Sequence, residues 1–119
     1  IFPEVFKQRY TSAVLVEGIF DMLNLYDKGL ENVCCTFGTN TLHKDTAMKL
    51  LALKSQGVHK IYVCYDGDDA GKQAADKLLP LIEECGFSAE KITLEDGTDP
   101  GDLSQEYVDS IREYINEPR

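Results

Sequence analysis

The chain has 119 residues, of which 43% are hydrophobic and 28% charged, so we expect one globular domain with a buried core. Its 21 acidic residues outnumber its 12 basic ones, and the net charge of -9 excludes nucleic-acid binding through bulk electrostatics, which depends on clustered Lys and Arg. No apolar run is long enough to span a membrane and no signal peptide is recognisable, so we expect a cytoplasmic location.

The first half of the chain predicts two strands, each followed by a helix. Residues 12–17 (SAVLVE) form a continuous apolar run that is typical of a buried strand, and residues 18–28 carry apolar side chains at helical spacing. The pattern repeats with a strand over 32–37 and a helix over about 42–56. Residues 1–11 precede these elements, and we expect them to be either a leader that packs on the domain or a linker.

The second half predicts two further strands and helices. Strands are expected over residues 60–65 and 89–95, and helices over 69–85 and 103–115. Pro80 lies inside the third helix, where we expect a kink or a break because proline lacks a backbone N–H and its ring clashes with the preceding turn. The regular alternation predicts an α/β fold, with about four mainly parallel strands and helices on both faces.

The cysteines and histidines do not predict a zinc site. The four cysteines form no C-x-x-C pair, and the chain contains only two histidines. Since the cysteines lie mainly in apolar runs, we expect reduced and largely buried thiols. The first residue is Ile rather than Met, which leads us to expect a piece of a longer or processed protein.

Carboxylates follow three of the four predicted strands. Glu17 and Asp21 follow the first strand, Asp66 and Asp68 the third, and Asp96, Asp99 and Asp102 the fourth. Since the carboxyl ends of parallel strands share one edge of the sheet, we expect these side chains to converge. Converging carboxylates repel unless a cation neutralises them, and hard oxygen ligands favour Mg²⁺ or Mn²⁺. The sequence therefore predicts a metal site that serves phosphate chemistry.

Other metal- and phosphate-binding motifs do not fit. An EF-hand loop that began at Asp66 would need an acidic or amide residue at Ala70 and a glutamate at Lys77. The chain contains neither G-x-x-x-x-G-K-[ST] nor G-x-G-x-x-G, which excludes a P-loop and gives no support to a dinucleotide site. A phosphatase with an aspartyl nucleophile would more naturally place D-x-D after the first strand, where this chain has Glu17. Asp69 is assigned to the start of the third helix, which favours acidic residues.

The ordered motifs VEGIFD (16–21), FGT (37–39), DGDDAG (66–71) and TDPGDL (98–103) resemble a Toprim domain, and more narrowly the catalytic core of bacterial and phage DnaG-type DNA primases. The resemblance implies a Toprim (Rossmann-like) fold over residues 12–119 of a larger primase. It implies a Mg²⁺ cofactor, for which Mn²⁺ substitutes, and nucleotidyl transfer for RNA primer synthesis in DNA replication. It also implies single-stranded DNA template, nucleoside triphosphates and a replicative helicase as partners of the parent protein.

The resemblance further implies roles for individual residues. Glu17 matches the glutamate that helps to bind metal and is proposed to act as an acid or base. Asp66 and Asp68 match the paired metal ligands of the D-x-D motif, and together with Glu17 they are the expected catalytic residues. Asp21 and Asp99 match further acids of the metal cluster.

One part of the chain departs from the family pattern. Primases often read D-P-D where this chain reads Asp99-Pro100-Gly101-Asp102, so the metal ligand expected there is either Asp99 or Asp102. Additional candidates are the small turn residues Gly38 and Gly71. Thr39 either caps a helix or orients an acid, and Lys72 either contacts a phosphate or is solvated.

Two alternatives to primer synthesis stay open at this point. A metal-dependent Toprim nuclease would cleave DNA or RNA and would lose this activity in Glu17→Gln. A non-catalytic Toprim interaction module would tolerate Asp66→Asn without a change in metal affinity or parent activity. The convergent acids favour catalysis over the interaction module, because a scaffold has no reason to hold repelling carboxylates together.

Overall fold

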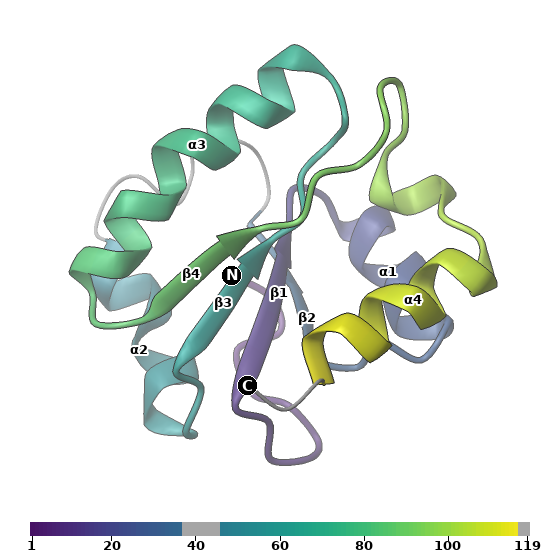
Figure 1. Ribbon diagram of the computed structural model, residues 1–119. Coiled ribbons are helices and arrows are strands. Elements are labelled where there is room, and N and C mark those ends of the chain that lie inside the picture. Colours follow the sequence, from purple (N-terminus) through teal and green to yellow (C-terminus); the bar gives the residue numbers. More distant parts are fainter. Residues whose placement is uncertain (37–45, 117–119) are drawn as a thin grey trace.

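The computed structural model describes residues 1–36 and 46–116 of the chain (Figure 1). In chain order the elements are β1 (Ser12–Val16), α1 (Ile19–Asp27), β2 (Val33–Cys35), α2 (Thr46–Ser55), β3 (Lys60–Val63), α3 (Asp69–Glu84), β4 (Ser88–Lys91), the 3-10 turn η1 (Pro100–Asp102) and α4 (Gln105–Asn116). The predicted alternation of strands and helices is confirmed. The predicted start of the second helix, at about Leu42, lies outside the described residues.

The four strands form one parallel sheet in the order β2-β1-β3-β4. The central pair β1 and β3 aligns Leu15 with Val63, so the residues that follow these two strands emerge side by side. The chain moves outward from β1 to β2 and then returns to the other side of β1 for β3. This reversal of direction makes the carboxyl ends of β1 and β3 the switch point at which open α/β sheets bind ligands.

Each face of the sheet is covered by two helices (Figure 1). On one face, α2 and α3 pack against alternate strand residues, and this core includes Leu15 and Leu78. On the other face, α1 and α4 pack against the intervening strand residues, and this core includes Val14 and Leu25. The period of two along each strand divides its apolar side chains between the two cores, which explains why the central strand β1 is apolar from Ala13 to Val16.

The predicted break at Pro80 is wrong, because α3 continues through this residue as one helix. Pro80 itself is exposed, whereas Leu78 and Ile82 on either side of it are fully buried. The buried side chains anchor the helix to the sheet before and after the proline. Tertiary packing therefore outweighs the local cost of the missing backbone donor.

All four strands are shorter than predicted, and two of the shortened elements, β4 and the last helix, border the loop after β4. The strand β4 ends at Lys91, because this residue pairs with Val63, the last residue of its partner β3. The Ile92 N–H then donates to the Val63 carbonyl at 2.9 Å. The last helix begins at Gln105, because Pro100–Asp102 forms a separate 3-10 turn. Both changes lengthen the loop that follows β4 and allow it to reach the end of β3.

Residues 1–11 pack against the rest of the chain. Phe2 and Cys35 form an antiparallel bridge through two backbone hydrogen bonds of 3.0 and 2.7 Å, at the free edge of β2. Phe6 is buried, and its N–H donates to Gln56 Oε1 at 3.1 Å at the end of α2. These contacts hold the segment against β2 and the end of α2. Its assignment as a leader or a linker stays a prediction. The division of the chain at residue 12 stays a prediction.

Two expectations from composition have structural counterparts. Cys34, Cys35 and Cys64 are buried, Cys85 is half-buried, and all four are free thiols. Burial raises the pKa of Cys34 and Cys64 to about 12, which makes them inert core residues. Among the described residues, no helix has the length and apolar character needed to cross a bilayer.

Candidate functional site

Carboxylates gather at the carboxyl ends of β1 and β3 and in the loop that follows β4. We call Glu17, Asp21, Asp66, Asp68 and Asp99 the acidic site. The backbone N–H of Asp66 donates to Glu17 Oε1 at 3.2 Å, which joins the ends of the two central strands directly. Asp21 lies in the first turn of α1, four residues after Glu17. The structure thus brings residues of β1, β3 and α1 together as the sheet topology predicts.

Asp66 lies at the centre of the acidic site. Its Oδ1 atom is buried and has no hydrogen-bond partner among the described residues. Burial raises the pKa of this carboxyl to about 6, and the negative charges of Glu17, Asp21, Asp99 and Asp68 add to the increase. An oxygen that is buried without a donor and faces four other carboxylates is held at a free-energy cost, which a bound cation would remove.

Glu17 and Asp21 have the same electrostatic character. Burial raises the pKa of Glu17, and the carboxylates of Asp68 and Asp21 raise it further. Burial also raises the pKa of Asp21, with contributions from Asp99 and Asp102. In the described part of the chain no ion pair joins the acidic site to a lysine or arginine. Within the described residues, the charge of Asp68 also acts on Lys72, whose own ion pair is with Asp96, so the acidic site has a nearby cation but no ion pair with it.

Asp68 has a second role that the sequence did not reveal. It is the N-cap of α3, and its Oδ1 accepts a hydrogen bond from the Gly71 N–H at 2.7 Å. Asp69, which was assigned to the helix start, is the first residue of α3. Gly71 also contacts the end of β3, since a Cβ there would lie 2.3 Å from the Asp66 carbonyl oxygen. One carboxylate oxygen of Asp68 is therefore engaged in capping α3.

The loop after β4 runs back beside the turn that follows β3 (Figure 1), and one glycine in each segment allows the close approach. Gly67 donates its N–H to the Thr98 carbonyl at 2.7 Å, which ties the loop to the turn after β3. A Cβ on Gly101 would lie 2.9 Å from Asp99 Oδ1 and 3.0 Å from Asp21 Oδ1, so this glycine fits between two carboxylates. Sequence reasoning missed both residues, and their only signal was a glycine directly before an aspartate, Asp68 or Asp102.

The structure distinguishes the two acids of the Asp-Pro-Gly-Asp segment. Asp99 is half-buried and acts electrostatically on both Asp66 and Asp21. Asp102 is exposed, and its charge acts on Asp21 but not on Asp66. Asp99 directly precedes the turn η1, whereas Asp102 is its last residue. Asp99 is therefore the acid of this loop that belongs to the acidic site.

The remaining candidates are a lysine at the border of the acidic site and two residues outside the described part of the chain. Lys72 forms an ion pair and hydrogen bond with Asp96 on the surface. Gly38 and Thr39 are outside the described residues. Within residues 1–36 and 46–116, no three Asp, Glu, His or Cys side chains are gathered closely enough to hold a metal ion as they stand. Repulsion among unneutralised carboxylates opposes such an approach.

The stability of the metal-free chain is expected to depend on the ionisation of Asp66. An aspartate in an unfolded chain has a pKa of about 3.9, whereas folding raises the pKa of Asp66 to about 6. The folded state therefore binds this proton more tightly, and the associated stability is lost as the pH rises from about 4 through 6. Relative to Asp66→Asn, the wild type should lose about 1–2 kcal/mol of unfolding free energy over this range, after allowance for solvent screening.

Urea unfolding of the wild type and Asp66→Asn, without added metal and at a series of pH values, measures this loss. Asp69→Asn is the matched control, because it makes the same chemical change at an exposed residue of the α3 start. A difference between wild type and Asp66→Asn that stays constant with pH contradicts the prediction.

Comparison with known proteins identifies the family of the chain. The model of the Toprim-like family matches residues 14–104. The DNA primase of Aquifex aeolicus is 37% identical over 105 residues, which cover 87% of this chain and 20% of that protein. The chain spans a fifth or less of the length of the curated primases that it matches.

Solved structures give the same result. The structure of the zinc-binding and RNA polymerase domains of the Aquifex aeolicus primase aligns with a TM-score of 0.67 at 32% identity, covering 89% of this chain and 25% of that one. A DnaG primase catalytic domain bound to single-stranded DNA aligns with a TM-score of 0.65 at 28% identity, covering 89% and 34%. The chain therefore belongs to the Toprim-like family, as a Toprim domain of the kind found in DnaG-type DNA primases.

Proposed function

We propose that this chain is the metal-binding catalytic domain of a DNA primase, which performs nucleotidyl transfer in RNA primer synthesis. The observation that carries the proposal is the buried, unpartnered Oδ1 of Asp66 among four other carboxylates of the described residues. The similarity to DNA primases supports the same reaction. Because the chain spans a fifth or less of those proteins, the activity is proposed for the parent protein and not for this segment alone.

The donor set fits Mg²⁺, for which Mn²⁺ substitutes, because it consists of carboxylate oxygens alone. Asp66 would be the central ligand, with Glu17, Asp21 and Asp99 around it. Asp68 would contribute the oxygen that does not cap α3. A bound divalent cation supplies charge neutralisation for the phosphates of a nucleoside triphosphate and for the charge that develops in the transition state. The raised pKa of Asp66 marks the place where that positive charge is most needed.

Glu17 is the proposed acid or base of the site. Its Oε1 accepts the Asp66 N–H, so the carboxylate is held at the junction of β1 and β3. Burial raises the pKa of Glu17, which makes it a stronger proton acceptor than an exposed glutamate and favours general acid–base chemistry. Nucleotidyl transfer needs no covalent nucleophile from the protein, and carboxylates held in place are the main requirement.

The net charge of -9 indicates how the template is held. An acidic surface repels DNA phosphates, so the single-stranded template must be gripped chiefly by basic surfaces elsewhere in the parent protein. We propose a single-stranded DNA template, nucleoside triphosphates and a replicative helicase as the partners of that parent, and the cytoplasm as its location. The isolated chain is expected to bind Mn²⁺ without sustained template-directed synthesis.

Incubation of the full-length parent protein with single-stranded DNA, nucleoside triphosphates and Mg²⁺ tests the proposal. The expected product is short RNA that requires both template and metal, with EDTA as the control that removes the metal. Cleavage of the DNA without RNA synthesis, abolished in Glu17→Gln, would instead establish the nuclease. Neither product, together with unchanged parent function in Asp66→Asn, would establish a non-catalytic interaction module.

A further inference from the structure

Besides Asp21, whose carboxylate accepts a hydrogen bond from the Gly101 backbone, a second side chain of α1 holds the loop that carries Asp99. Asn24 lies one turn after Asp21 and is half-buried. Its Nδ2 donates to the Pro100 carbonyl at 2.8 Å and to the Leu103 carbonyl at 3.2 Å. These two carbonyls are at the start of the turn η1 and immediately after it. Asn24 therefore binds the loop at two points, directly after Asp99.

The neighbours of Asn24 determine how its amide is oriented. Lys28 Nζ donates to Asn24 Oδ1, one turn further along α1. An ammonium group needs the amide oxygen, whereas two carbonyls need the amide NH₂, so only one orientation satisfies all three partners. The amide is thus fixed with both of its donor hydrogens directed at the loop.

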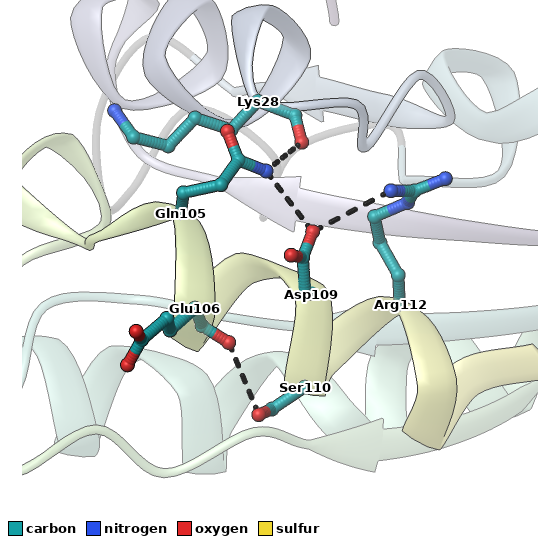
Figure 2. Close-up of polar contacts among 6 residues, drawn as sticks. All are labelled: Lys28, Gln105, Glu106, Asp109, Ser110 and Arg112. Atoms are coloured by element: carbon teal, nitrogen blue, oxygen red, sulfur yellow. Dashed lines mark hydrogen bonds and ion pairs between the residues drawn. The ribbon is translucent and has the colours of Figure 1, made fainter.

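The backbone of Lys28 provides a second, separate contact (Figure 2). Its carbonyl accepts from Gln105 Nε2 at 2.7 Å, and Gln105 Nε2 also donates to Asp109 Oδ1 at 3.0 Å. Figure 2 shows the Gln105 amide directed at this carbonyl from the start of α4. This contact joins α1 to α4 beyond the loop, and it does not touch the segment between Asp99 and Leu103.

The two hydrogen bonds from Asn24 to the loop oppose the electrostatic repulsion between Asp99 and Asp21. Asp99 and Asp21 both lie within contact reach of Gly101, and the charge of Asp99 raises the pKa of Asp21. Without a cation, these two carboxylates tend to separate by moving the loop away from α1. The η1 turn that Asn24 holds is closed by the bond from the Asp102 N–H to the Asp99 carbonyl, so holding η1 also holds Asp99.

We infer that Asn24 is a positioning residue, which keeps Asp99 beside Asp21 so that both acids are in place when a divalent cation binds. The inference rests on the metal site of the proposed function. It assigns to Asn24 a part in metal affinity although its side chain is not a metal ligand. Residues that orient ligands in this way affect affinity through the ligand that they hold.

Mn²⁺ titration followed by electron paramagnetic resonance tests the inference on the isolated chain. Asn24→Ala and Asn24→Leu should each weaken Mn²⁺ binding about 10-fold, as loss of an outer-shell partner does. Both replacements favour a helix more than asparagine does, so α1 itself is not weakened, and circular dichroism verifies the fold. In Asp99→Ala, which removes the ligand, the further change Asn24→Ala should cause no additional loss.

Gln105→Ala is the matched control, because it breaks the contact between α1 and α4 outside the loop and should leave Mn²⁺ affinity unchanged. Failure of the wild type to bind Mn²⁺ would refute the metal site and with it this inference. Normal binding by Asn24→Ala, when Asp99→Ala is impaired, would overturn the inference alone. The inference would also be overturned if the Asn24→Ala and Asp99→Ala losses of Mn²⁺ affinity added in full in the double variant. It would likewise be overturned if Gln105→Ala lost as much affinity as Asn24→Ala.

Discussion

Replacement of Asp66 with asparagine is expected to lower the Mn²⁺ affinity of the chain about 100-fold or more, since loss of an outer-shell partner alone costs up to about that much. The asparagine would retain the size of the side chain but lose the negative charge at the buried Oδ1 position of the acidic site. The change also removes the buried charge and the repulsion from neighbouring carboxylates, which together raise the pKa of Asp66 to about 6, so the metal-free variant stays folded. Loss of binding can then be attributed to the ligand and not to unfolding.

Isothermal titration with Mn²⁺ on the isolated chain measures this loss. Asp69→Asn is the control, because it removes one negative charge three residues away on the exposed start of α3. If the two variants bind Mn²⁺ equally well, Asp66 is not a metal ligand. In the full-length parent, RNA synthesis should fall with Asp66→Asn and persist with Asp69→Asn.

Replacement of Gly67 with alanine is expected to lower the unfolding free energy by about 3 kcal/mol, at the upper end of the usual cost of overpacking. A Cβ at this position would lie 2.1 Å from the Glu95 carbonyl oxygen and 3.0 Å from that of Thr98. Both atoms belong to the backbone, so no side-chain rotation relieves the overlap. The loop after β4 must move away, and the hydrogen bond from the Gly67 N–H to the Thr98 carbonyl is strained or lost.

Urea unfolding at a fixed pH, monitored by circular dichroism, measures this change. Gly18→Ala is the matched control, because a Cβ there would meet its nearest atom, Asp21 Oδ2, at an ordinary 3.5 Å. Gly18 is the N-cap of α1, where alanine costs at most about 1 kcal/mol relative to glycine. Equal destabilisation by the two variants would mean that the close approach of the loop to Gly67 does not contribute to stability.

The two predictions separate two properties of one site. Asp66 supplies charge, and its replacement should change metal binding while the fold persists. Gly67 lacks a side chain and so lets the loop after β4 approach closely, and its replacement should move this loop, which carries Asp99. Metal affinity should fall in both cases, but only Gly67→Ala should combine that fall with a loss of stability.

The sequence predicted the alternation of strands and helices and the parallel sheet, because apolar periodicity and the need for crossover connections are local properties. It also predicted where the carboxylates meet. Glu17 and Asp66 follow strands, and every strand of a parallel sheet ends at the same edge, so convergence follows from topology before any contact is known. The Toprim resemblance, on which the expectation of a primase rested, was carried by the same strand-end motifs.

Only the tertiary structure decided the details that depend on contacts between distant segments. The charge of Asp99 acts on Asp66 and that of Asp102 does not, and the η1 turn between these two acids is bound by Asn24, which is 76 residues away from Pro100 in the chain. Pro80 remains within a helix because buried residues on both sides anchor it to the sheet. Local patterns specify elements and their order, whereas the choice between neighbouring acids and the survival of a helix depend on packing and hydrogen bonds that form only after the elements come together.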